Sequence, residues 1–519
     1  MENANTYVRT LTLDEALHEN PVGWFQYRLL LMCGLAFMAD ALEVSLLSFL
    51  ATCAGADWGL STAEEASITS VVFIGIVCGT MFWGMFADKY GRKLSYFAAC
   101  GLITAGGFLS GASPSYGWLI FFRSVAGFGI GGASVPFDLL AEFLPTSHRG
   151  QFLIYIEYFW TIGSMFVAGL AWATLSQQGW RFLAYMTAIP VLFASVASYF
   201  YLPESPRWLL IKGRVAEAEE IVRAAALVNG VTMEPYRLAG VTVDELSIKD
   251  ATYMDLFRDK EAMRTSIPLW IVWTMFGFTY YGIILFVGRL YSTDDDDGSD
   301  DKKCSFDYES IFINSTAEVV GCTVCALCID RFGRVKSQTL FYLLAGFSVF
   351  LMGFETGVTA VMVVGFMARI GALAASNATW VTTPELYSTE MRTVGHSTCV
   401  AISKFGSFAA PYLVISSASD VTVGIVLCAM NVIGAVAANF LPDTTNMKMD
   451  QVDTLRSSRV SFDAKEGARH SKDGWFTGPG GGSSAEVLNA LRLDSYPGGA
   501  DDTSGLLAPL NERDDDGRF

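Results

Sequence analysis

Twelve long apolar segments constrain what this chain of 519 residues can fold into more than any other feature of its sequence. A helix needs about 20 apolar residues to cross the hydrocarbon core of a bilayer. With only 17% charged residues and 52% hydrophobic ones, the chain is too apolar for a water-soluble or a disordered protein. We therefore expect an all-α membrane protein with twelve transmembrane helices, over residues 28–51, 66–87, 94–112, 117–143, 152–175, 181–202, 267–290, 308–329, 337–355, 358–385, 394–416 and 420–441.

Lysine and arginine gather in alternate loops, which the positive-inside rule places in the cytoplasm. Lys89, Arg92 and Lys93 follow the second span, whereas residues 53–65 contain no basic residue. The pattern predicts a multi-pass protein with both termini cytoplasmic, and its basic stretches include a central loop over 203–266 with a helical run near Val215 to Val228. The leader over 1–27 lacks a basic n-region, so no cleaved signal peptide is expected.

The remaining polar segments have their own composition. The tail over 442–519 is rich in Gly, Ser and Asp and is typical of disorder. The acidic run from Asp294 to Asp301 follows the seventh span on the non-cytoplasmic side, where we expect a solvated loop rather than a cation site.

The two halves of the chain, over 28–202 and 267–441, repeat each other. Asp88 and Arg92 after the second span recur as Asp330 and Arg334 after the eighth, 242 residues later. The residues that end the fourth span recur after the tenth at nearly the same offset, and so do two intramembrane arginines: these pairs are Glu142 and Glu385, Arg149 and Arg392, and Arg123 and Arg369. A duplicated six-helix unit is the architecture of secondary transporters, which bind substrate between the halves near the membrane midplane.

The motifs resemble those of the major facilitator superfamily. Gly84-x-x-x-Asp88-x-x-Gly91-Arg92-Lys93 resembles its signature loop, and Arg123-x-x-x-Gly127-x-Gly129 resembles a second motif. Pro203-Glu204-Ser-Pro-Arg207-Trp resembles the sugar-porter and organic-ion branches. More narrowly, Met38-Ala-Asp40-Ala-Leu-Glu43, Ile156-Glu157-Tyr-Phe-Trp160, Tyr280-Tyr281-Gly282 and Thr383-Pro-Glu385-Leu-Tyr387 are similar to synaptic vesicle 2-related proteins. The resemblance implies two pseudo-symmetric six-helix halves, alternating access, a monomer, no enzymatic activity and no cofactor; the sugar-porter glutamine pattern is absent between Leu269 and Val287.

Charged residues inside the spans are the first candidates for the transport site, because each costs roughly 2.5–3.5 kcal/mol at a helix centre. Asp40 and Glu43 share one helix face at spacing i, i+3. Two carboxylates this close would bind a proton or attract a cation; alternatively, one of them pairs with Arg123 or Lys404 as a structural lock.

The second group of candidates mixes charge with aromatic and amide side chains. Glu157 and Trp160, again i, i+3, suit an organic cation, or they are a paired acid beside a packed ring. Lys404 either sets the sign of the substrate or pairs with an acid of the first span. The polar groups of the other candidates line the cavity or only pack between helices: Tyr280, Tyr281 and Asn377.

Opposite charges at the cytoplasmic helix ends suggest a gate of salt bridges within and between the halves, which break when the halves rock open. The alternative is plain positive-inside topology, which does not explain the acids. We assign to this gate Asp88, Arg92, Arg123, Glu142, Arg149, Glu204, Arg207, Asp330, Arg334, Arg369, Glu385 and Arg392.

Several other patterns have less consequence. A net charge of −17 argues against a nucleic-acid partner, and the thiols Cys322, Cys325 and Cys328 are expected to pack rather than to bind metal. Cys53 and Cys304 lie on the oxidising, non-cytoplasmic side, where the redox conditions permit a disulfide between them. Asn314-Ser-Thr is a glycosylation sequon at a membrane edge, and Leu506-Leu507 after Asp502 matches a signal for sorting adaptors.

The sequence therefore predicts a secondary active transporter of a small organic ion, driven by protons, in the plasma membrane or an intracellular vesicle membrane. Asp40 and Glu43 would bind the proton or a cation, and the other candidates would line the cavity. Two alternatives stay open: a facilitative sugar-type carrier, and a vesicle or trafficking protein that keeps the carrier fold without transport.

Overall fold

The computed structural model describes residues 9–239, 254–258, 260–292, 304–354, 357–387 and 391–444. The acidic run from Asp294 to Asp301 and the tail with Leu506 and Leu507 lie outside these residues. Ten helices of the described part are long and apolar enough to cross a membrane. One of these, over 151–201, is two spans broken at Gly179, and a further helix carries Lys404, so the architecture is that of twelve spans.

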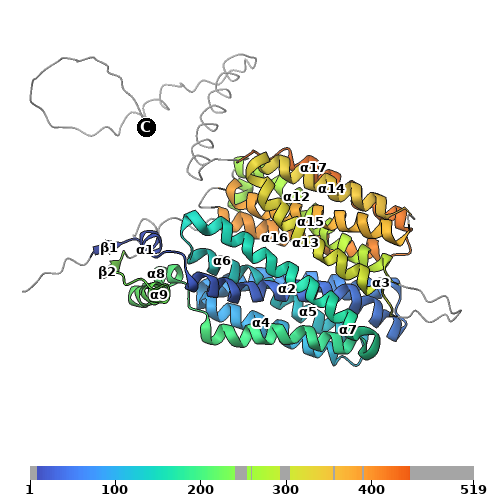
Figure 1. Ribbon diagram of the computed structural model, residues 1–519, viewed down its shortest axis with the longest axis horizontal. Helices are drawn as coiled ribbons and strands as arrows, with labels where there is room; N and C mark the ends of the chain where they lie inside the picture. The colour runs from blue at the N-terminus through green and yellow to red at the C-terminus, as the bar shows by residue number, and fades with distance from the viewer. Residues whose placement is uncertain are drawn as a thin grey trace, which may run out of the picture. The chain divides into compact units, whose positions relative to one another are not determined.

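The helices form two bundles that lie side by side (Figure 1). The first half contains α2 (Trp24–Trp58), α3 (Thr62–Tyr90), α4 (Arg92–Gly111), α5 (Tyr116–Ile130), the short η1 (Gly131–Ala133), α6 (Ser134–Glu142) and α7 (Thr146–Tyr201). The second half contains α12 (Lys260–Leu290), α13 (Tyr308–Phe332), α14 (Arg334–Met352), α15 (Val358–Leu386), α16 (Arg392–Val414) and α17 (Asp420–Ala438). The short α11 (Asp255–Arg258) precedes the second half.

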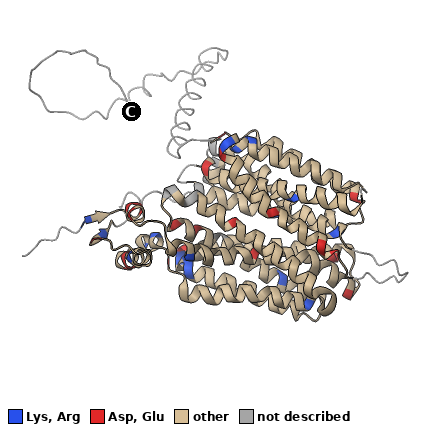
Figure 2. Cartoon of the chain, in the orientation of Figure 1, with Lys and Arg blue, Asp and Glu red and all other residues tan. Residues whose placement is uncertain are grey.

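The two ends of the bundles differ in their residues. The end at which α3 meets α4, with Asp88 and Arg92, and α13 meets α14, with Asp330 and Arg334, is called the motif end. The opposite end, at which Cys53 and Cys304 form a disulfide, is called the disulfide end. Charged residues gather toward the helix ends and are sparse along the middle of the bundles, as Figure 2 shows.

The glycine of each signature loop has a conformational reason. Gly91 and Gly333 are the single residues between α3 and α4 and between α13 and α14, and their φ angles are 106° and 95°. Residues with a Cβ rarely adopt such angles. A Cβ on Gly91 would also collide with the carboxylate of Glu204. The two halves thus share the same one-residue turn, as the sequence repeat predicts.

Glycines also let α3 approach α5 closely. A Cβ at Gly75 would collide with the carbonyl oxygen of Ser124, and one at Gly79 would collide with that of Phe128. These small residues therefore allow close packing of the two helices.

The leader and the central loop fold together. β1 (Arg9–Leu11) pairs in parallel with β2 (Tyr236–Leu238), and α1 (Leu13–Glu19) lies near α8 (Pro206–Ile211) and α9 (Val215–Val228) at one end of the first half (Figure 1). Their apolar side chains form a cluster separate from the main core. The helix α9 has the bounds expected from sequence, whereas the docking of the leader was not predicted.

Candidate functional site

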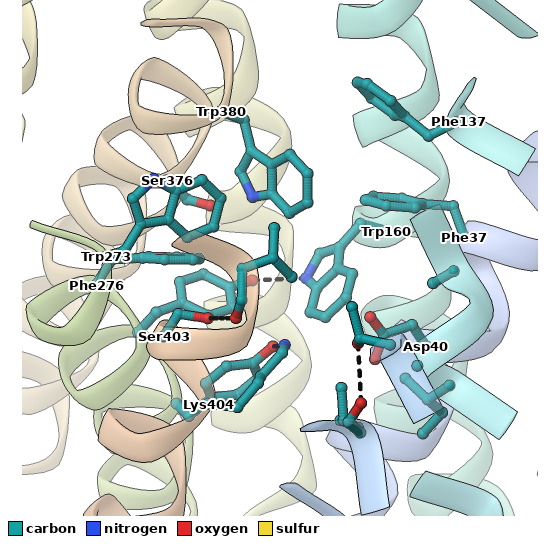
Figure 3. A pocket seen from close by; sticks show the side chains of 18 of the residues that line it. Phe37, Asp40, Phe137, Trp160, Trp273, Phe276, Ser376, Trp380, Ser403 and Lys404 are labelled. Carbon is teal, nitrogen blue, oxygen red and sulfur yellow. Dashed lines mark hydrogen bonds between the residues drawn. The ribbon is translucent and has the colours of Figure 1, made fainter. Parts of the chain in front are cut away.

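A cavity lies between the two halves, toward the middle of the long helices. Its wall combines residues of α2, α3, α5, α6 and α7 with residues of α12, α15 and α16, and Figure 3 shows the two sets facing each other. The space between the atoms of this wall, including the part open to solvent, is about 740 Å³. Its lining includes Phe37, Asp40, Ile76, Thr80, Phe137, Glu157, Trp160, Trp273, Phe276, Tyr280, Tyr281, Ser376, Trp380, Val400, Ser403 and Lys404.

Three charged side chains line this cavity. Asp40 and Glu157 come from the first half and Lys404 from the second, and all three side chains are buried, with 7–8% exposed. Asp40 attracts Lys404 and is repelled by Glu157, but no two of the three form an ion pair among the described residues. The Asp40 Oδ1 atom is buried without a hydrogen-bond partner. Lys404 donates to the hydroxyl oxygen of Tyr281 at 3.2 Å and lies over its ring.

Aromatic rings form most of the remaining wall. The Trp160 indole N–H donates to the Tyr280 hydroxyl oxygen at 2.6 Å, so this hydrogen bond joins α7 to α12 across the halves. The Tyr280 hydroxyl donates in turn to Glu318 Oε1 at 3.1 Å. Five of the predicted lining residues, Glu157, Trp160, Tyr280, Tyr281 and Lys404, therefore line one cavity together with Asp40.

Sequence reasoning missed the other aromatic residues of the wall. Trp273 and Phe276 precede Tyr280 at positions that a helix brings to one face, i−7 and i−4, and Phe37 precedes Asp40 at i−3. The helical spacing of these aromatic residues from the candidates Tyr280 and Asp40 was the signal that could have identified them.

Glu43 does not line the cavity, which corrects its assignment to the binding site. Its carboxylate forms an ion pair with Arg123 at 2.5 Å, and the two side chains are 1% and 0% exposed. Arg123 also donates to Ser110 Oγ at 2.7 Å. The orientation of α2 points Asp40 to the cavity and Glu43 into the bundle. Glu43 is therefore the carboxylate that pairs with Arg123 as a structural lock.

Arg123 and Arg369 do not belong to the motif end, so their assignment to the gate is wrong in position. Ser110, the partner of Arg123, lies at the opposite end of α4 from Arg92, about 27 Å away at 1.5 Å per residue. Arg369 pairs with Glu318 at 2.6 Å, and Glu318 is twelve residues before Asp330 on α13. Both arginines neutralise buried acids instead.

Asn377 is buried in α15 but is not part of the cavity wall. Its side chain lies beside Cys322 of α13. It therefore packs between helices, the alternative to its assignment as a lining residue.

The charges at the motif end form one cluster in each half. Arg92 contacts Asp88 at 2.5 Å and Glu142 at 3.8 Å. In the second half, Arg334 contacts Asp330 at 2.7 Å and Glu385 at 3.2 Å. These pairs link helices within a half, and the ion pairs expected between the halves are not among those of the described residues.

The other predicted gate residues differ in their contacts. Glu204 accepts hydrogen bonds from the backbone N–H groups of Arg92 at 2.7 Å and Lys93 at 3.3 Å, which caps the start of α4. Arg207 contacts Asp14 of the leader at 3.4 Å. The side chains of Arg149 and Arg392 lie outside the described residues.

A ring contact joins the two halves on the side of the cavity toward the motif end. Phe137 of α6 and Trp380 of α15 lie 5.9 Å apart between ring centroids and come from different halves (Figure 3). Each is five residues from its cluster acid, Glu142 or Glu385. Both rings belong to the cavity wall.

Two further sequence features can be placed. Cys53 at the end of α2 and Cys304 before α13 form a disulfide with Cα atoms 4.8 Å apart. Asn314 is fully buried and donates to the Ser310 carbonyl oxygen, so its sequon is not accessible in this fold. No cluster of potential metal ligands occurs in the described part of the chain.

Comparison with known proteins places this geometry in context. The family model described as "Sugar (and other) transporter" matches residues 24–455. "Putative transporter svop-1" of Caenorhabditis elegans is 34% identical, over 78% of this chain and 79% of its own length. "Synaptic vesicle 2-related protein" of Xenopus laevis is 32% identical, over 86% and 83%, and "Organic cation/carnitine transporter 7" of Arabidopsis thaliana is 30% identical, over 80% and 89%. The partially occluded, inward-open structure of the xylose transporter XylE from E. coli matches with a TM-score of 0.64 and 18% identity, over 81% of this chain and 98% of that one.

Proposed function

The chain belongs to the sugar (and other) transporter family of the major facilitator superfamily, and we propose that it carries a small organic ion, coupled to protons, by alternating access. The cavity between the halves is the transport site in this proposal.

The observation that carries the proposal is the set of three buried charges without ion-pair partners. Each charge in a membrane-embedded wall costs a few kcal/mol, and structural charges such as Glu43 and Glu318 are paired. Asp40, Glu157 and Lys404 instead lie at the cavity wall, where a charged solute could neutralise them. A neutral sugar would leave these charges uncompensated, which favours an organic ion over the facilitative sugar-type carrier.

Asp40 is the proposed proton site. It lies close enough to Glu157 for mutual repulsion, and Oδ1 has no hydrogen-bond partner. Two carboxylates in a low-dielectric site are stabilised when a proton or another cation joins them. Proton binding and release at Asp40 would therefore change the charge of the cavity during each cycle.

The motif end would face the cytoplasm, because the basic loops follow the helices at this end. The clusters of Arg92 and Arg334 would hold the ends of the helices of each half as rigid units. The rocking motion would then separate Phe137 from Trp380 and open the cavity to the cytoplasm.

Proton coupling is tested by uptake of a small organic ion into proteoliposomes with an imposed pH gradient. The wild-type protein is compared with Asp40→Asn. We expect the gradient to drive uptake by the wild type and to have no effect on Asp40→Asn. Glu309→Gln, an exposed acid on α13, serves as the control and should keep the gradient dependence. Equal pH dependence of wild type and Asp40→Asn would show that Asp40 is not the proton site.

The trafficking alternative has a separate test. A protein that keeps this fold without transport would show no solute uptake under any gradient. If Leu506 and Leu507 recruit a sorting adaptor, their substitution by alanine should move the protein from vesicles to the plasma membrane while uptake per molecule stays constant.

A further inference from the structure

The charges of the cavity are divided between the two halves. Asp40 on α2 and Glu157 on α7 form an acidic side, and Lys404 on α16 forms a basic side. Figure 3 shows Asp40 and Lys404 on opposite sides of the cavity, with Trp160 between them. A bound molecule that touches both sides therefore touches both halves.

Each side has unused capacity for hydrogen bonds. An ammonium group has three donors, and the hydrogen bond of Lys404 goes to the Tyr281 hydroxyl. Among the described residues, neither Asp40 nor Glu157 has a hydrogen bond or close ion pair, although both are more than nine-tenths buried. Buried charges without partners are costly, so a ligand with complementary groups gains from both sides.

We infer that the cavity takes zwitterions, with the cationic nitrogen of the substrate at Asp40 and Glu157 and its carboxylate at Lys404. The inference rests on the proposed function and names its substrate class. The aromatic wall fits the cationic end, because Trp160 and Phe37 lie beside the acidic side with their rings 5.9 Å apart and aromatic faces attract quaternary or protonated nitrogen.

The charge balance separates zwitterions from simpler ions. With all three groups ionised, the two carboxylates and one ammonium leave the cavity with one negative charge. A zwitterion leaves this charge unchanged, so one added proton makes the loaded cavity neutral. An organic cation alone would neutralise the cavity and compete with the proton, and an organic anion would need two protons. Among substrates that carry charged groups, only the zwitterion leaves a place for one coupled proton, and a loaded cavity without net charge is closed off between the halves at least cost.

Bridging also gives the substrate a role in closure. A ligand shifts a conformational equilibrium only by its difference in affinity for the two states. A zwitterion held by Asp40 and Lys404 would favour the state in which the halves approach each other, whereas a simple cation would contact only the first half.

The test compares matched ligands on the wild-type protein, by thermal stabilisation at fixed pH. One series has a pyridine ring: nicotinamide (neutral), nicotinate (anion), N1-methylnicotinamide (cation) and N-methylnicotinate (zwitterion). A second series is aliphatic: butyltrimethylammonium, hexanoate and 4-(trimethylammonio)butyrate. We expect the zwitterion of at least one series to bind at least about tenfold more tightly than its matched cation and anion.

Variants assign the two sides. Lys404→Gln should remove the preference for the zwitterion over the cation, and Glu157→Gln should remove its preference over the anion. Matched controls are Lys336→Gln and Glu309→Gln, which alter exposed residues away from the cavity and should keep both preferences. The wild-type comparison does not depend on whether the variants fold.

The outcomes separate this inference from the proposed function. If a cation or an anion binds as tightly as its matched zwitterion, or if neither zwitterion binds at millimolar concentration, the zwitterion assignment is overturned. Proton-driven uptake of another organic ion by the same vesicles would then leave the proposed function standing. Loss of all gradient-driven uptake would instead overturn the proposed function itself.

Discussion

Asp40 and Glu43 lie one helical turn apart on α2 but differ in their surroundings and in ion pairing. Asp40 lines the cavity without an ion pair, whereas Glu43 is locked to Arg123 inside the first half. The spacing i, i+3 predicted that both carboxylates share one helix face. It could not show which of them meets Arg123, because that depends on the rotation of α2 against α5, which many contacts of the core decide together.

The first prediction concerns this pair. Glu43→Gln should lower the free energy of unfolding by about 3–5 kcal/mol, because it leaves the Arg123 charge buried without an acid. Asp40→Asn, one turn away, should have little effect on stability, since Asp40 has no ion-pair partner. Thermal unfolding of the purified variants checks both results, and a Glu43→Gln protein as stable as the wild type would contradict the structural assignment.

At the scale of elements, the helices were predictable and the leader was not. Apolar length predicted the spans, and the repeated signature loops predicted that α3–α4 and α13–α14 share a turn. The leader pairs through β1 and β2 with a segment more than two hundred residues away. No local pattern shows such a contact, because each three-residue strand is too short to carry a periodic signal of its own.

The second prediction tests how the leader is held. The Asn229 side chain donates to Asn20, Pro21 and Gln26 at 2.9–3.0 Å, and its oxygen accepts from the Phe25 N–H at 2.9 Å. Asn229→Ala should remove these bonds and open the leader locally, at a cost of about 1–3 kcal/mol. Hydrogen exchange at Leu11 and Leu238 should become faster, whereas the exposed control Glu234→Ala should leave it unchanged. Unaltered exchange in Asn229→Ala would mean that the apolar cluster alone holds the leader.

At the scale of the whole transporter domain, the halves meet through rings and hydrogen bonds rather than through ion pairs of the described residues. Trp160 reaches Tyr280, Ser70 donates to the Phe408 carbonyl oxygen at 2.9 Å, and Phe137 meets Trp380. Contacts of this kind separate at lower cost than buried ion pairs. The buried pairs Glu43–Arg123 and Glu318–Arg369 each lie within a half, so the proposed rocking motion would leave them intact.

The third prediction places the Phe137–Trp380 contact on the path from the motif end. A Ser376→Cys reporter in the cavity wall should react slowly with an impermeant maleimide applied to the motif end. Adding Phe137→Ala should speed the reaction about tenfold, as a shift of 1.4 kcal/mol toward the open state would do. The protein with Ser376 gives the background from its other cysteines. A rate that does not change would remove this ring contact from the path.

The disulfide between Cys53 and Cys304 has a consequence for the connectivity of the chain. It closes a covalent ring of the backbone that spans 251 residues and includes α3 to α12. A protease that cuts anywhere inside this ring, for example after the half-exposed Arg214, leaves both pieces in one molecule. They would migrate as a single band until a reductant is added and then separate into two. In sealed vesicles, the side from which a protease cuts at Arg214 reports which face of the membrane carries this segment.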